Sequence, residues 1–368
     1  MQDDFEVPMS KPDITVDEIN AVVDVLRRGW VTQGRVTDQF ETLLADYLSS
    51  NIVVVNSGSS ALLCALIAHG IKPRDKIIVP DFTFVATASV PKILGAKLLV
   101  VDVDKDTFNI NPESVERLLK KNKDVKAVIV VDVAGLPVDI EAFMELSRRY
   151  HFVLIEDAAE AFGAEYKHKK LGSFNHTTIF SFQIAKQITT IEGGCIATTD
   201  EDITKKSRHI RNYGRDENVR YVHPFLGLNL RTTDIQSAIG IVQFKKLESY
   251  LCRRNKIATE YKEKIRGLAY QTIPSYANRC SYMLFFAVAQ DKAERNNYVS
   301  QLVNKGIDAR MPWTPIHMQP CFPEFNKAKY RNAEYIFNHA FSLPIYNRMT
   351  TYDVDTVIES VNRENEGR

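Results

Sequence analysis

The sequence predicts an α/β protein built on a large, mostly parallel sheet, with a smaller α+β domain near its C-terminus. Short runs rich in Val, Ile and Leu alternate with helical segments from residue 51 to about residue 163. Near-continuous apolar strands separated by helices are typical of a parallel sheet that helices cover on both faces. The length of 368 residues, with 45% hydrophobic and 25% charged residues, suits two globular domains.

The first expected element is a helix near residues 15–28. Thr15 and Glu18 have the spacing of a capping box, which marks the beginning of a helix. The residues that follow form an apolar stripe at helical spacing. The stripe consists of Ile19, Val22, Val23 and Leu26.

From residue 51 onward, β-branched strand segments alternate with helical segments. In chain order they are NIVVVNS then SSALLCALIAHG, KIIVP then a helix near residues 85–94, KLLVVDVD then PESVERLLKK, VKAVIVVDVAG then IEAFMELSRRYH, and FVLIEDAAEAFG. A long helix is expected after residue 233, followed by one clear strand, YMLFFAVA, and two late helices. We therefore predict a large domain of residues 1–250 and a small C-terminal α+β domain of residues 251–368.

Composition and charge exclude several classes of protein. The formal net charge is +1 and acids and bases are mixed along the chain, so a nucleic-acid partner is not expected. The five cysteines form no CxxC pair, so neither a disulfide framework nor a zinc site is expected, and no other metal site. A run of four arginines is interpreted as a solvated or anion-facing segment. It consists of Arg208, Arg211, Arg215 and Arg220.

No part of the sequence resembles a membrane or export segment. No apolar run reaches the roughly 20 residues that span a bilayer. The N-terminus MQDDFEVPMSKPDIT is acidic and polar, without the apolar core of a secretory signal. We expect a soluble, cytoplasmic protein without a membrane partner.

Four segments stand where strands end, which is where ligands collect in sheets of this kind. In NSGSSA at residues 56–61, small residues lead into a helix whose free N–H groups suit a phosphate, with a plain β–α turn as the alternative. In IEDAAE at residues 155–160, Asp157 ends an apolar strand. A protonated pyridine nitrogen would be a suitable partner for this buried carboxylate, with a helix N-cap as the alternative.

The other two segments carry Lys186 and Phe84. Lys186 lies between a strand and a Gly-Gly turn in SFQIAKQITTIEGG. Holding a lysine away from bulk water favours the neutral amine, which is the nucleophile in Schiff-base formation, whereas a lone lysine is more often a surface charge. Phe84, in DFTF after the strand KIIVP, could lie against a flat heterocycle or pack in the core.

The order and spacing of these segments resemble the DegT/DnrJ/EryC1/StrS family of sugar aminotransferases, which are fold type I enzymes that use pyridoxal phosphate (PLP). The resemblance extends from about residue 8 to residue 365, nearly the entire chain. The matching stretches are GSSALLCAL, VPDFTFVATA, GAKLLVVDVDKDTFNINP, IEDAAEAFGA, SFQIAKQITTIEGGCIATTD, RNYGRDE, LGLNLRTTDIQSAIG, TPIHMQP and SLPIY.

The resemblance implies a fold type I PLP-dependent transferase with PLP as its cofactor. Lys186 matches the lysine that carries PLP as a Schiff base, and Asp157 matches the partner of the pyridine nitrogen. Phe84 matches the aromatic that stacks on the ring, and Glu160 lies where relatives have a residue near the ring hydroxyl. Three further residues match positions that hold the phosphate. They are Gly58, Ser59 and Ser181.

The resemblance also implies partners. Asn229, in LGLNLRTTD, matches an asparagine that reaches the phosphate of the neighbouring subunit, which implies a homodimer with shared active sites. His317, in TPIHMQP, lies in a segment that relatives use around the nucleotide-sugar. The implied substrates are L-glutamate and a nucleotide-linked keto-sugar. The segment TTIEGG at residues 189–194 is similar to that of the 4-keto-sugar aminotransferases of the GDP-perosamine synthase type, which favours amination at C4 of a deoxysugar.

Two positions depart from the family pattern. Most relatives have a glycine where this chain has Ile191, and the usual HLYG-like segment reads Val133, Ala134 and Gly135. Three alternatives therefore stay open: an unusual substrate, amination at C3, and an enzyme like aminohydroxybenzoate synthase. The FSFQ segment is similar to that of the last of these. A dehydratase of the same fold would have histidine in place of Lys186. A non-catalytic homologue would have lost Lys186, Asp157 or the phosphate loop, so both readings are disfavoured.

Overall fold

A seven-stranded sheet forms the centre of the computed structural model, which describes residues 5–216, 219 and 221–366. Glu217 of the RNYGRDE motif and Arg220 of the arginine run lie outside the described residues. In chain order, the strands are β1 (Asn51–Val55), β2 (Lys76–Pro80), β3 (Lys97–Val101), β4 (Val125–Val131), β5 (Val153–Asp157), β8 (Thr177–Ser181) and β9 (Gly194–Thr198).

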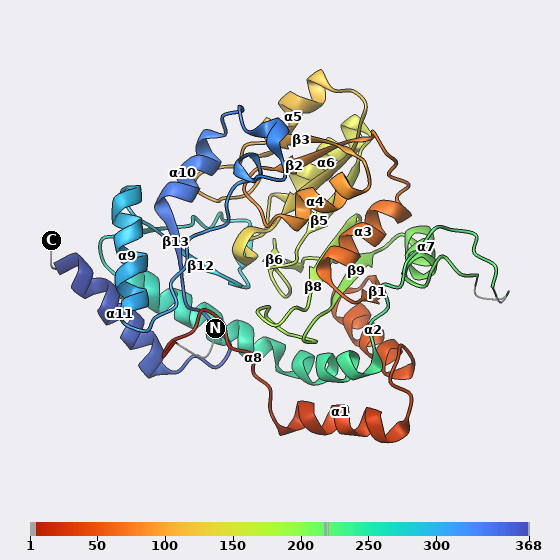
Figure 1. The fold of residues 1–368 in the computed structure, drawn as a ribbon, viewed down its shortest axis with the longest axis horizontal. Coiled ribbons are helices and arrows are strands. Elements are labelled where there is room, and N and C mark those ends of the chain that lie inside the picture. Colours follow the sequence, from red (N-terminus) through yellow and green to blue (C-terminus); the bar gives the residue numbers. More distant parts are fainter. Residues whose placement is uncertain (1–4, 217–218, 220, 367–368) are drawn as a thin grey trace.

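The order across the sheet is β1-β9-β8-β5-β4-β2-β3. Figure 1 shows β2 and β3 toward one end of the sheet and β1 toward the other. β9 pairs antiparallel with β1 and with β8. The other neighbouring strands pair in parallel. The predicted large, mostly parallel sheet is therefore confirmed. The parallel strands β4, β5 and β8 lie side by side, so their carboxyl ends meet at one edge.

Helices cover both faces of this sheet, as the apolar strands predict. Val53 and Val55 of β1 belong to one apolar core with three helices, whereas Ile52 and Val54 point to the opposite core. The first set is α3 (Gly58–Ala68), α4 (Ala86–Ile93) and α7 (Glu201–Arg211). The second set is α2 (Arg35–Leu48), α5 (Pro112–Lys121), α6 (Ile140–Tyr150) and α8 (Asp234–Lys264).

The described part of the chain also contains three short helical turns and two smaller sheets. The turns are η1 (Val133–Gly135), η2 (Ile316–Met318) and η3 (Pro323–Phe325). One small sheet has the order β11-β6-β7, formed by β11 (Ala277–Arg279), β6 (Glu165–Tyr166) and β7 (Lys169–Lys170). The other has the order β10-β12-β13, formed by β10 (Ala269–Tyr270), β12 (Phe285–Val288) and β13 (Ala340–Leu343).

The C-terminal part of the chain has its own apolar core. α8 contributes residues both to this core and to the core beneath the large sheet. α9 (Lys292–Asn304) and α11 (Thr351–Glu366) pack there with β12 and β13, and α10 (Arg331–His339) lies nearby. β12 confirms the strand expected in YMLFFAVA. Among the described residues, three helices follow it instead of two, because the largely polar α9 lacks an apolar stripe. α8 continues through residue 250, and Val7 belongs to the C-terminal core. The division at residue 250 stays a prediction.

The first helix begins as expected but turns its apolar stripe outward. Thr15 and Glu18 form the predicted capping box at the beginning of α1 (Val16–Arg28). Ile19 and Leu26 are exposed, whereas Glu18 is buried. α1 lies along α8, where Lys246 donates a 2.6 Å hydrogen bond to Glu18 and Ala238 packs against Val25. The side of α1 that carries Glu18 and Val25 therefore faces the rest of the chain. No helix in the described part of the chain is long and apolar enough to cross a membrane.

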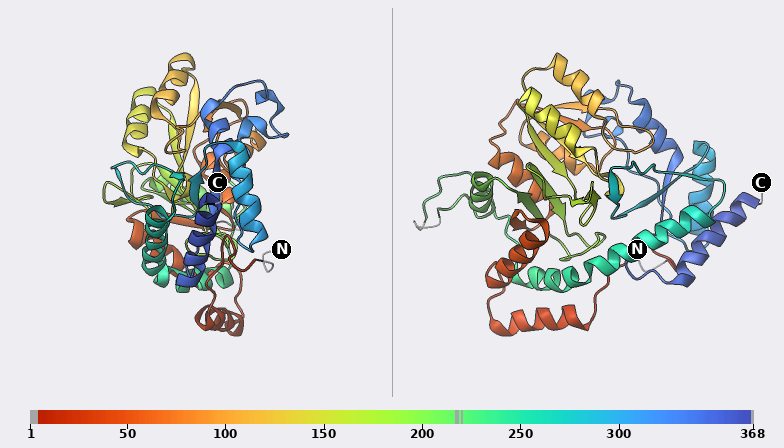
Figure 2. Two further views of the ribbon diagram at one scale, coloured as in Figure 1. Left: turned by 90° about the vertical axis from the view of Figure 1, so that its left-hand side faces the viewer. Right: turned by 180° about the vertical axis from the view of Figure 1, so that it is seen from behind.

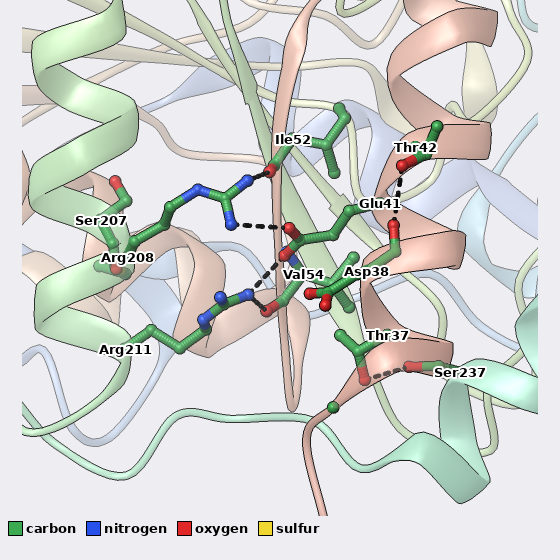
Figure 3. Close-up of polar contacts among 12 residues, drawn as sticks. Thr37, Asp38, Glu41, Thr42, Ile52, Val54, Ser207, Arg208, Arg211 and Ser237 are labelled. Carbon is green, nitrogen blue, oxygen red and sulfur yellow. Dashed lines mark hydrogen bonds and ion pairs between the residues drawn. The ribbon is translucent and has the colours of Figure 1, made fainter. Parts of the chain in front are cut away.

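Side chains occupy the outer edge of β1 (Figure 3). Glu41 of α2 accepts a 2.9 Å hydrogen bond from the N–H of Val54 and forms ion pairs with Arg208 and Arg211 of α7. Arg211 also donates to the carbonyl of Val54 at 2.7 Å, and Arg208 donates to that of Ile52 at 3.1 Å. Two arginines of the predicted run thus face a carboxylate of the same chain. The cluster satisfies backbone groups that an edge strand would otherwise present to another strand.

Candidate active site

A cavity of about 410 Å³ lies at the carboxyl ends of β4, β5 and β8. Segments that are far apart in the sequence meet there, as expected for an open α/β sheet. Seven of the nine residues singled out in the sequence line this cavity. They are Gly58, Ser59, Phe84, Asp157, Glu160, Ser181 and Lys186.

The N-terminus of α3 forms one side of the cavity. Ser57 caps this helix by accepting a 3.1 Å hydrogen bond from the N–H of Ser60. The first N–H groups of a helix lack partners within the helix and lie at the positive end of its dipole. A Cβ atom at Gly58 would lie 2.9 Å from the Cβ of Ser181, so glycine is required where α3 approaches β8. The arrangement suits a phosphate group.

Asp157 lies on the floor of the cavity and is only 7% exposed. Its carboxylate accepts hydrogen bonds from the hydroxyl of Thr87 at 2.8 Å and from the N–H of Ala159 at 3.2 Å. Burial raises the pKa of Asp157, and these two hydrogen bonds oppose the rise. Turns follow β5 instead of a helix, so the N-cap alternative for Asp157 is wrong.

Lys186 and Glu160 both line the cavity and form an ion pair there. The Nζ of Lys186 lies 3.7 Å from an Oε of Glu160, and the lysine side chain is 13% exposed, so Lys186 is not a solvated surface charge. Burial raises the pKa of Glu160, and Lys186 opposes the rise. The other Oε of Glu160 accepts a 2.8 Å hydrogen bond from the N–H of Ala134. Glu160 therefore joins the lysine to the segment that departs from the HLYG pattern.

Two hydrophobic residues are exposed, one lining the cavity and one in the loop that follows Lys186. Phe84 is 55% exposed and lines the cavity, so it is free to contact a ligand instead of packing in the core. Ile191 has a φ of 69° and is also exposed. This is the left-handed conformation that favours glycine, so the loop keeps the backbone that a glycine would adopt and places a β-branched side chain in it.

Several residues of the cavity were not singled out in the sequence. Thr87, which bonds to Asp157, lies one turn beyond Phe84, and its place in VPDFTFVATA was the available signal. Trp313 and Met283 enter the cavity from the C-terminal part of the chain. Their positions depend on tertiary folding, and no local pattern marks them.

Asn229 and His317 do not line the cavity. Asn229 is exposed beside Asn212, with which it forms an isolated β-bridge. His317 is buried, and its Nδ1 lies 2.6 Å from a carboxylate oxygen of Asp81 at the end of β2. His317 borders a second pocket of about 720 Å³. The segment from Trp313 to His317 therefore borders both cavities.

The family model described as "DegT/DnrJ/EryC1/StrS aminotransferase family" matches residues 12–362. The chain belongs to this family. It is an aminotransferase with PLP as its cofactor, and its fold is that of the fold type I PLP-dependent transferases. The resemblance predicted from the sequence is thus confirmed.

Two curated relatives match the chain along almost its whole length. An uncharacterized protein, MJ1066, of Methanocaldococcus jannaschii is 36% identical, with 97% of each chain covered. GDP-perosamine synthase of Caulobacter vibrioides is 32% identical, with 99% of each chain covered. The second relative is a named synthase of a nucleotide-linked sugar, so the family match extends to sugar aminotransferases.

Two solved structures of the family share this fold. DesV of S. venezuelae, in complex with a ketimine intermediate, is 28% identical with a TM-score of 0.92, and 98% of each chain is covered. The PLP form of the putative sugar aminotransferase Spr1654 of Streptococcus pneumoniae is 27% identical with a TM-score of 0.92, with 98% of this chain and 99% of that chain covered.

The cavity of this aminotransferase fits PLP in three respects. The α3 N-terminus and the close approach at Gly58 provide a cradle for the phosphate. The burial that raises the pKa of Asp157 would be offset by a protonated pyridine nitrogen beside it. Lys186 supplies a shielded amine in the same cavity. The residues present therefore match the donor set that the cofactor needs.

Proposed function

We propose that this enzyme transfers the amino group of L-glutamate to the C4 keto group of a nucleotide-linked deoxysugar. The observation that carries the proposal is the convergence of Lys186, Asp157 and the Gly58 cradle in one cavity. The TTIEGG segment favours C4 over C3, and the likeness to GDP-perosamine synthase supports a nucleotide-linked substrate. Retention of Lys186 argues against a dehydratase.

PLP, when bound, supplies an electron sink for the carbon that exchanges its amino group. Lys186 would hold the cofactor covalently and, once released by the incoming amine, move the proton at the α-carbon of glutamate as a general acid/base. Asp157 would keep the pyridine nitrogen protonated, which strengthens the electron sink. Phe84 would lie against the ring, and Ser59 and Ser181 would bind the phosphate. Glu160, 3.7 Å from the amine of Lys186, would orient that amine.

The active unit we propose is a homodimer with shared sites. Asn229 lies outside the cavity of its own subunit and is exposed, so it is free to reach the phosphate cradle of a partner. The described parts of the segment between α7 and α8, residues 212–216 and 221–228, project from the body of the subunit (Figures 1 and 2). Exposed apolar residues on this segment and around α1 suit an interface. They are Val16, Ile19, Leu26, Trp30, Phe225, Leu226 and Leu228.

The nucleotide part of the substrate would extend beyond Trp313 toward His317. Trp313 lines the cavity that holds Lys186, and His317 borders the neighbouring pocket. Two hydrogen bonds from His317 to Asp81, at 2.6 and 2.9 Å, fix this segment to the end of β2. A ligand that spans both cavities would therefore contact a firmly held segment.

Two measurements test the proposal. Purified protein with PLP should have a visible absorbance band that borohydride removes, because Lys186 binds the cofactor covalently. A panel of nucleotide-linked 4-keto and 3-keto sugars is then offered with L-glutamate, and 2-oxoglutarate is measured. Production of 2-oxoglutarate with a 4-keto sugar is expected. Turnover of 3-keto sugars alone, or of a carbocyclic ketone as in an aminohydroxybenzoate synthase, would contradict the C4 assignment.

A further inference from the structure

Arg254, in the middle of α8, is a buried cation bound to neutral groups. It is 2% exposed, and its Nε donates a 2.7 Å hydrogen bond to the side-chain oxygen of Asn347. Its Nη1 donates to the carbonyl groups of Tyr282 at 2.8 Å and Ile345 at 3.2 Å. Among the described residues, no carboxylate forms an ion pair with Arg254.

Such an arginine is costly to bury. Desolvation lowers the pKa of Arg254 to about 10. Buried charges are usually paired, and a well-packed apolar residue in such a place is often as stabilising. An apolar residue could therefore supply comparable stability at this position. The guanidinium adds hydrogen bonds that hold the segment of residues 345–347 against α8.

A hydrogen bond connects this segment to Gln187, the residue after Lys186. Asn347, which is 7% exposed, donates a 2.9 Å hydrogen bond from its amide to the backbone carbonyl of Gln187. One amide side chain thus accepts from Arg254 and donates to Gln187. The link crosses from the C-terminal part of the chain to the loop that carries the lysine.

Gln187 is held from its side chain as well. It is fully buried, and its Nε2 donates to the hydroxyl of Ser281 at 2.8 Å and to the backbone carbonyl of Glu160. Ser281 donates a 3.0 Å hydrogen bond to the same carbonyl of Glu160. Glu160 is the residue that faces the amine of Lys186. The position of Gln187 therefore determines where both members of the Lys186–Glu160 pair lie.

We infer that Arg254 and Asn347 are positioning residues for Lys186, acting through the backbone carbonyl of Gln187. Through these two residues, the C-terminal part of the chain positions the amine of Lys186 in the cavity. This role rests on the proposed function of Lys186 and deepens it. The proposed relay has the order Arg254, Asn347, Gln187 and Lys186.

The test compares PLP-loaded variants of the whole protein. Asn347→Leu removes both hydrogen bonds of the relay at similar volume, and Arg254→Met removes the guanidinium. A lysine displaced by a fraction of an ångström should lower the single-turnover rate with L-glutamate about 10- to 100-fold. The pH midpoint of the visible band of the lysine-bound cofactor should also shift. The KM for the sugar substrate should not change. In the double variant the losses should not add, because both residues act along one path.

Arg253→Met is the matched control. Arg253 is the preceding residue on α8 and donates to the carbonyl of Met349 in the same region, at 2.9 and 2.6 Å, without contact to the relay. This variant should keep the wild-type midpoint and rate even if its melting temperature falls. Asn347→Leu decides the question alone if Arg254→Met does not fold.

The outcomes separate this inference from the proposed function. If folded Asn347→Leu keeps the wild-type midpoint and rate, the positioning role is overturned while the function of Lys186 stands. The role is also overturned if Arg253→Met shifts the midpoint as much as Asn347→Leu. If the wild-type protein itself forms no visible band with PLP, the proposed function of Lys186 fails.

Discussion

Lys186 is the side chain on which the proposed chemistry depends most. Lys186→Ala should abolish turnover, because it removes both the covalent anchor of the cofactor and the proton carrier, and general acid/base action alone contributes roughly 10²–10⁴-fold. The variant should fold, since the lysine contributes few packing contacts at the cavity edge. Initial rates and a thermal melt measure both effects. A variant that transaminates at a near wild-type rate would contradict the assignment of the site.

A substitution of Asp157 should lower the catalytic rate without lowering the stability of the PLP-free protein. Asp157→Asn should retain PLP but lose most of the rate, because an amide cannot keep the pyridine nitrogen protonated. Burial raises the folded-state pKa of Asp157 above its value in the unfolded chain. The stability that the carboxyl group contributes is therefore complete below its ordinary pKa and is lost as the pH rises through the raised value.

Without PLP, Asp157→Asn should consequently be at least as stable as wild type at neutral pH, with a weaker dependence of melting temperature on pH. Melts of the PLP-free proteins between about pH 4 and pH 8 measure this difference. An unchanged catalytic rate, or an apoprotein that the amide strongly destabilises, would mean that the carboxylate has another role.

At the scale of single residues, the sequence placed seven site residues in one cavity because strand ends of a parallel sheet converge. Trp313 and Met283 could not be found in this way, since they approach from the C-terminal part of the chain. Asp81 is the first residue of the DFTF segment, and no local pattern marks it as the partner of a distant histidine. Its partner, His317, lies far away in the sequence and is brought to β2 by the tertiary fold.

Among the secondary-structure elements, edge strand β1 depends on the Glu41 cluster. Glu41→Ala should destabilise the protein by about 3–5 kcal/mol, because it leaves Arg211 buried without its carboxylate and exposes the N–H of Val54. Glu116→Ala is the control, since Glu116 pairs with Lys120 and Arg149 on the surface. Chemical denaturation measures both free energies of unfolding. Equal changes in the two variants would mean that the cluster contributes no more than a surface pair.

The prediction of elements succeeded where burial and local pattern agree. The strands from β1 to β5 are apolar on both faces, and the sequence marks them for that reason. The helix at residues 16–28 was also found, because its capping box is local. Its orientation was not, since the contact of Glu18 with Lys246 bridges distant parts of the chain. The polar α9 lacks the pattern that would have revealed it.

In the whole molecule, we propose one explanation, a second subunit, for the exposed stripe of α1 and for the apolar segment before Asn229. An isologous contact would cover both surfaces and complete two sites at once. The subunit alone leaves Leu226 91% exposed, which is costly for an aliphatic side chain in water. The assembly therefore belongs to the same proposal as the phosphate site.

Mixing an inactive chain with a weakened one tests this assembly. Lys186→Ala lacks the lysine, and Asn229→Ala should be weak because the phosphate of the partner's cofactor loses a hydrogen bond. If the sites are shared, a heterodimer of the two variants has one site with both lesions and one intact site. Activity should therefore rise toward half of the wild-type value per heterodimer, while each variant alone stays low. Native mass spectrometry of the mixture establishes that heterodimers are present. In a heterodimer with shared sites, one site combines the wild-type Lys186 of one chain with the wild-type Asn229 of the other, so activity must return there. No rescue in such a mixture would mean that Asn229 contributes to the site of its own subunit, or to no site.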